Sequence, residues 1–102
     1  MSESDYTIIA ELVVSPIGVG VSLSKYVKKA VEKINSRKDI RVLHHPMGTV
    51  IEATSLDTIF EVAKEAHQAL IDLGCPRVIT TLKIDDRRDK PRKMEDKVKA
   101  IS

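Results

Sequence analysis

Four short stretches of the chain have the residue patterns of β-strands, with apolar or β-branched side chains recurring at a period of two. Residues 8–14 and 77–85 are rich in β-branched side chains at a period of two. Between them, the runs 41–45 and 50–53 flank the turn Pro46-Met47-Gly48, and this arrangement predicts a β-hairpin. The pattern therefore predicts a sheet that the hairpin and the two outer runs build together.

The first predicted strand is apolar on both faces. One face carries Ile8, Ala10, Leu12 and Val14, and the other carries Ile9, Glu11 and Val13. Glu11 is the exception, because a carboxylate among apolar neighbours must be paired, hydrated or in contact with a ligand. We expect the segment from Ser15 to Gly20, which contains Pro16 and two glycines, to end this strand.

Two longer stretches have apolar residues at helical spacing. The first begins at Ser22 as N-cap, with Ser24 as a second candidate, and ends near residues 35–36. The second follows the N-cap signal of residues 54–55 and ends at Gly74. Each half of the chain thus contains one amphipathic helix.

The order strand, helix, strand, strand, helix, strand predicts an α+β fold, the ferredoxin-like βαββαβ sandwich. Two helices would cover one face of a four-stranded antiparallel sheet. Met94, Val98 and Ile101 predict a short C-terminal helix after the fold. We expect residues 1–102 to form a single domain that is poorly ordered at residues 1–6 and 99–102.

The sheet face that the two helices leave open would carry Ile9, Val13 and Ile79 beside Glu11 and Lys83. These apolar side chains are too many to leave in water. We therefore expect self-association, with subunits that cover one another's sheets.

Composition excludes several classes of function. Hydrophobic residues make up 42% of the chain and charged residues 31%, which is ordinary for a soluble protein. Aromatic residues make up 3%, and the net charge is +2, so a surface for nucleic acid is not expected. The sequence has neither a run of about 20 apolar residues, as a membrane span needs, nor a secretory signal. Cys75 is the one cysteine, which rules out an intrachain disulfide and favours the cytoplasm.

Other candidate sites are weak. The glycine-rich turn of residues 15–22 leads from a strand into a helix, where backbone amides favour anions, but it lacks the lysine of a phosphate loop. His44 and His45 are adjacent on a strand and point to opposite faces, and His67 has no partner at a ligand spacing. We expect no metal site, no catalytic residues and no cofactor.

Glu11 and Glu52 are the carboxylates that the predicted strands place within the sheet, in what could be its two central strands. Such a pair could hold a cationic or amino-bearing heterocycle through charge-assisted hydrogen bonds. Salt bridges to Lys83, Arg77 or Arg41 explain the two carboxylates equally well.

Several segments together resemble the family of small thiamine-binding proteins. They are Ser15-Pro16-Ile17-Gly18, Ser22-x-Ser24-x-Tyr26-Val27, His45-Pro46-Met47-Gly48-Thr49-x-Ile51-Glu52, Arg77-Val78 and Lys83-Ile84-Asp85-Asp86-Arg87. The resemblance covers nearly the whole chain. Ala53 stands where that family usually has glycine.

The resemblance implies a ferredoxin-like fold and sheet-to-sheet dimers and tetramers. It implies binding of thiamine or its pyrimidine moiety without catalysis. Carried over residue by residue, it places the ligand near Glu11, Ser15, Gly18, Ser22, Thr49 and Glu52.

Two other functions remain open at this point. An enzyme of small-molecule metabolism with an interface pocket would need Glu11 or Glu52 as a residue with a shifted pKa. A structural or regulatory assembly module that binds no metabolite would be favoured if both carboxylates were salt-bridged.

Overall fold

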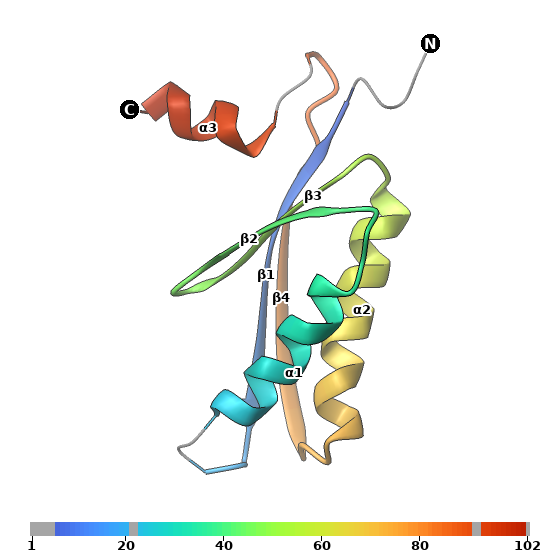
Figure 1. Cartoon of the computed structure of the whole chain (residues 1–102), viewed down its shortest axis with the longest axis vertical. Helices are drawn as coiled ribbons and strands as arrows, with labels where there is room; N and C mark the ends of the chain where they lie inside the picture. The colour runs from blue at the N-terminus through green and yellow to red at the C-terminus, as the bar shows by residue number, and fades with distance from the viewer. Residues whose placement is uncertain (1–5, 21–22, 91–92, 102) are drawn as a thin grey trace.

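The computed structural model describes residues 6–20, 23–90 and 93–101. In chain order the elements are β1 (Ile8–Ile17), α1 (Ser24–Asn35), β2 (Arg41–His45), β3 (Gly48–Ala53), α2 (Leu56–Asp72), β4 (Arg77–Asp85) and α3 (Met94–Ile101). The strands form one antiparallel sheet in the order β2-β3-β1-β4 (Figure 1). The predicted α+β ferredoxin-like fold with a C-terminal helix is confirmed.

The core lies between one face of the sheet and the pair α1 and α2. On β1, Ile8, Ala10 and Leu12 are each 2% exposed, and they face the same side as their β3 partners Ala53, Ile51 and Thr49. Ile51, with Ile59 and Leu70 of α2, is fully buried. The alternation along β1 and β3 therefore decides which side chains meet the helices.

The first strand is longer than the sequence predicts. β1 continues through Ser15 and Pro16 to Ile17, in register with Ile79, Val78 and Arg77 of β4, so the prediction that this segment ends the strand is wrong. β3 pairs with β1 only as far as Leu12, and beyond it β1 pairs with β4 alone among the described strands. Proline, which has no N–H, is tolerated where a strand pairs on one side.

Helix ends agree in part with the sequence. The Ser55 hydroxyl accepts a hydrogen bond of 3.4 Å from the Thr58 amide at the start of α2, and Gly74, at φ +89°, follows its end. Ser22 lies outside the described residues. Leu23 occupies the N-cap position of α1 without a side-chain cap, so the alternative that Ser24 is the cap is wrong.

The expected poor order at the ends concerns residues 1–6 and 99–102. Residues 1–5 and 102 lie outside the described set, and residues 99–101 belong to α3.

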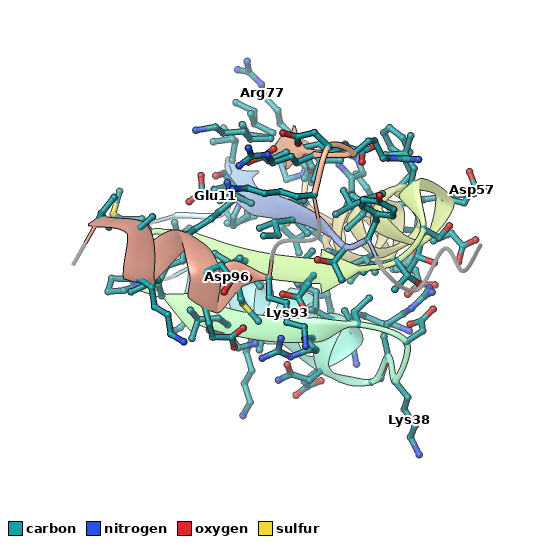
Figure 2. All side chains as sticks on the ribbon, turned by 90° about the horizontal axis from the view of Figure 1, so that it is seen from above. Glu11, Lys38, Asp57, Arg77, Lys93 and Asp96 are labelled. Atoms are coloured by element: carbon teal, nitrogen blue, oxygen red, sulfur yellow. The ribbon has the colours of Figure 1, made fainter. Side chains whose placement is uncertain are left out.

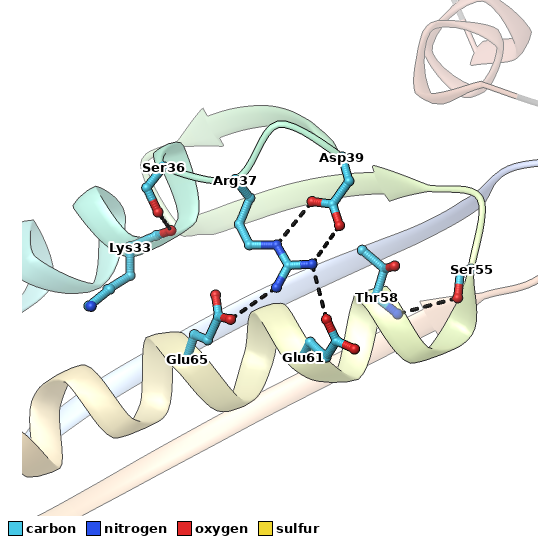
Figure 3. A network of polar contacts seen from close by, with 8 residues as sticks. All are labelled: Lys33, Ser36, Arg37, Asp39, Ser55, Thr58, Glu61 and Glu65. Atoms are coloured by element: carbon cyan, nitrogen blue, oxygen red, sulfur yellow. Dashed lines mark hydrogen bonds and ion pairs between the residues drawn. The ribbon is translucent and has the colours of Figure 1, made fainter.

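A cluster of ion pairs joins the loop after α1 to α2 (Figure 3). The guanidinium of Arg37, 15% exposed, donates to both carboxylate oxygens of Asp39 at 3.0 and 2.5 Å. It also donates to Glu61 at 3.1 Å and to Glu65 at 3.0 Å. The hydrogen bonds from Arg37 hold the pKa of Asp39 below its ordinary value of 3.8.

We predict that Asp39→Asn reduces the loss of stability in acid. A carboxylate whose pKa is lowered by folding stabilises the protein above its ordinary pKa, and this contribution disappears as the pH falls through the folded-state pKa. Urea unfolding at about pH 6 and about pH 3 should therefore show a smaller difference for Asp39→Asn than for the wild type. Glu32→Gln removes an exposed ion pair in which Oε1 of Glu32 lies 3.7 Å from Nζ of Lys29. This variant should retain the wild-type difference in stability between the two pH values. Identical differences for all three proteins would contradict the assignment to Asp39.

Candidate ligand-binding site

Two hollows lie on opposite faces of the sheet. The first, called the crevice below, has a volume of about 500 Å³ and lies between α1 and the β2–β3 hairpin. The second, called the cleft, has a volume of about 550 Å³ and lies beneath α3. Figure 2 shows α3 on one side of the sheet and Asp57 of α2 on the other.

The crevice has apolar walls and a short polar network. Its walls include Val27, Val31 and Ile34 of α1, and the hairpin contributes His44 and Thr49. Thr49 is 6% exposed, and its Oγ1 lies 3.0 Å from Nδ1 of His44. Nε2 of His44 lies 2.9 Å from Oδ1 of Asn35, the last residue of α1. The crevice can therefore enclose a flat apolar ring and offer it a few oriented hydrogen-bonding groups.

The cleft is richer in charge, and most of its charged side chains form ion pairs. Glu52 is 4% exposed; its Oε1 accepts from Arg41 at 2.8 Å, and its Oε2 accepts from the backbone amide of Met94 at 2.8 Å. Arg41 also pairs with Glu95, and Lys97 pairs with Asp85. The hydrogen bond from Arg41 holds the pKa of Glu95 below its ordinary value.

These pairs attach α3 to the sheet. The helix, described from Met94 to Ile101, has no buried residue, and Val98 is 60% exposed. Polar contacts, rather than packing of its apolar side chains, therefore hold α3 in place.

Glu11 and Glu52 lie in the two central strands, as predicted, and both face the cleft side of the sheet. Oε2 of Glu11 lies 3.2 Å from Nε2 of His45. The salt-bridge alternative from the sequence is therefore what the structure shows for Glu52, with Arg41 as its partner. Glu11 takes a partner that the sequence did not suggest.

The six predicted ligand residues do not meet in one place. Thr49 lines the crevice, whereas Glu11 lines the cleft and Glu52 is bonded to its rim. Ser15 lies opposite Ile79 on β4, and Gly18 forms the turn after β1 with Pro76 beside it. Ser22 is outside the described residues.

Sequence reasoning missed Asn35 and the role of His44. His44 was considered only as a metal ligand. Its pairing with Thr49 follows from the hairpin, because a turn at residues 46–47 that pairs His45 with Gly48 also pairs His44 with Thr49. No such local signal connects Asn35 to this pair.

Within residues 6–20, 23–90 and 93–101, no group of three or more His, Cys, Asp or Glu side chains is arranged to hold a metal ion. In the same part of the chain, no helix has both the length and the apolar character that a membrane span requires.

The chain matches the model of the thiamine-binding protein family over residues 10–102. A UPF0045 protein of Methanothermobacter thermautotrophicus is 49% identical over 98 residues, which cover 92% of this chain and 95% of the relative. A UPF0045 protein of Bacillus subtilis is 36% identical over 98 residues, with coverage of 92% and 93%.

Solved structures agree with the fold. A Methanocaldococcus jannaschii protein superposes with a TM-score of 0.85 at 44% identity, covering 93% of this chain and 95% of that one. A Thermotoga maritima protein, described as a candidate for thiamine biosynthesis or salvage, superposes with a TM-score of 0.78. The latter is 23% identical, with coverage of 94% and 99%, and supports the fold alone.

We predict that Glu52→Gln loosens α3. The glutamine keeps an oxygen for the Met94 amide but loses the charge that pairs with Arg41, so unfolding in urea should show a loss of about 1–3 kcal/mol. Hydrogen exchange at the Met94 amide should also become faster. Glu95→Gln, at an exposed position that pairs with the same arginine, should cost clearly less. Equal losses for the two variants would contradict a central role for Glu52.

Proposed function

Because the chain belongs to the family of thiamine-binding proteins, we propose that it binds thiamine, or a pyrimidine related to it, in the crevice and catalyses no reaction on it. The observation that carries the proposal is the family match over residues 10–102. The crevice supports this location because it contains Thr49, which belongs to the predicted ligand set, is 6% exposed and lies among apolar side chains.

The chemistry of thiamine suits the crevice. Its pyrimidine is a flat ring with two ring nitrogens and an amino group. Apolar side chains such as Val27 and Val31 can contact the ring faces, and Thr49 with His44 can form hydrogen bonds at its edge. A volume of about 500 Å³ falls in the range of small-molecule sites.

The cleft is the weaker location. Both oxygens of Glu52 already accept hydrogen bonds from Arg41 and Met94, and Glu11 lies beside His45. A thiazolium cation would have to displace a cation of the protein itself to pair with Glu52. Glu11 and Glu52 are therefore less suited than Thr49 to contact a ligand.

Matched variants separate the two locations. We predict micromolar or tighter binding of thiamine to the wild type by calorimetry, and a loss of at least about tenfold for Val27→Trp, which fills the crevice. Val98→Trp, which places the same side chain at the cleft, should bind as the wild type does. Val27 and Val98 are 41% and 60% exposed, so neither change disturbs the core. The opposite pattern would place the ligand in the cleft, and no heat with the wild type would remove the proposal.

A second candidate function, assembly, is favoured by a separate observation. The sheet face that faces away from α1 and α2 carries Leu43 at 52% and Ile79 at 44% exposure, and the carboxylates Glu11 and Glu52 on this face are paired within the chain. Self-association through this face, as a dimer or a tetramer in the cytoplasm, would remove these side chains from water. Binding and assembly are compatible, because the crevice lies on the other face.

We predict that light scattering of the wild type gives a mass of an assembly of several 11.4 kDa chains, such as a dimer or a tetramer. Leu43→Glu should shift this mass toward that of one chain, because it places a charge in the apolar face. Leu56→Glu is a matched control on α2, where the leucine is 39% exposed on the other side of the sheet. A wild-type mass of one chain would contradict assembly.

A further inference from the structure

We propose that Asn35 and His44 fix the hydroxyl of Thr49 as a hydrogen-bond acceptor toward the crevice, so that Thr49 selects an amino group over a carbonyl group on a bound pyrimidine. The inference rests on the proposed function and goes beyond it, because it names the ligand group that is selected and the residues that select it.

The order of donors along the three residues follows from their chemistry. Oδ1 of Asn35 can only accept, so Nε2 of His44, 2.9 Å away, carries the proton and donates. A neutral imidazole has one N–H, and therefore Nδ1 of His44 is an acceptor. Oγ1 of Thr49, 3.0 Å from Nδ1, must then donate its single proton to it.

This order leaves Thr49 with lone pairs and no donor for a ligand. A threonine hydroxyl has one proton and two acceptor positions. Because Thr49 is 6% exposed and lines the crevice, water has little access to reorient its hydroxyl. The crevice therefore offers this oxygen as an acceptor.

The β2–β3 hairpin holds His44 and Thr49 in place, and the end of α1 holds Asn35. His44 and Thr49 are direct partners in the β2–β3 ladder, so their distance is set by the hairpin. Asn35 ends α1, and the following residue, Ser36, donates from its hydroxyl to the carbonyl of Lys33 at 2.7 Å. Arg37 then ties the same segment to α2 through Glu61 and Glu65.

An acceptor at this place distinguishes two kinds of pyrimidine. An exocyclic amino group donates to Thr49, whereas a carbonyl oxygen would face another oxygen and leave both without a partner. Sites built to hydrogen-bond a substrate group discriminate strongly against analogues that lack it. Thr49 is the contact residue in this scheme, and His44 and Asn35 are positioning residues.

The test compares thiamine with oxythiamine, in which a carbonyl oxygen replaces the amino group. By calorimetry, wild-type protein should bind thiamine at least about tenfold tighter. Asn35→Leu should reduce this ratio toward one, because His44 can then change tautomer and Thr49 can donate. Thr49→Val should abolish the ratio, and Thr49→Ser should retain it.

Each outcome decides a separate point. A wild type that binds neither compound overturns the proposed function together with this inference. Equal binding of the two compounds by the wild type overturns the inference and leaves the proposed function standing. A ratio that Asn35→Leu leaves unchanged overturns the positioning role, since a merely structural effect would weaken both compounds alike. Asn35 is exposed at the end of a helix, so this variant should fold.

Discussion

The burial of one face of β1 against α1 and α2 is the constraint on which the rest of the structure depends. Ile8, Ala10 and Leu12 can all be buried only in one register, because a shift of one residue would place Ile9 and Glu11 in the core instead. The partners of β1 on β3 then follow. Thr49 faces the helices and Glu52 faces away, because side chains three residues apart on a strand point to opposite faces.

The two faces consequently have different polar chemistry. On the helix side, a hydrogen-bond network of Asn35, His44 and Thr49 lies at the edge of an apolar space. On the opposite side, acids and bases neutralise one another and attach α3. A network without an ion pair is less costly to rearrange when an organic ring enters than an ion pair inside a cleft is to break.

Features of the fold that depend on neighbouring residues could be predicted from the sequence. Features that depend on contacts between distant segments could not. The hairpin at Pro46 and the cap at Ser55 depend on neighbouring residues, so both could be read directly. The continuation of β1 through Pro16 depends on β3 beginning opposite Leu12, which the sequence of β1 does not contain. The split of Glu52 and Thr49 between two faces, in contrast, already follows from the alternation along β3, because the two residues are three apart on one strand. The contact of Asn35 with His44 requires the packing of a helix end on a hairpin, which no local pattern contains.

The sheet order has a consequence for how the chain reaches its folded state. β1, the first strand to be synthesised, is completed on one side by β4, which leaves the ribosome after both main helices. Until then the apolar part of β1 beyond Leu12 has no strand partner among the described elements, because β3 begins opposite Leu12 and runs from there toward Ile8. Pairing of strands so distant in sequence is intrinsically slow. The half-made sheet is therefore the stage at which a nascent chain most needs protection from aggregation.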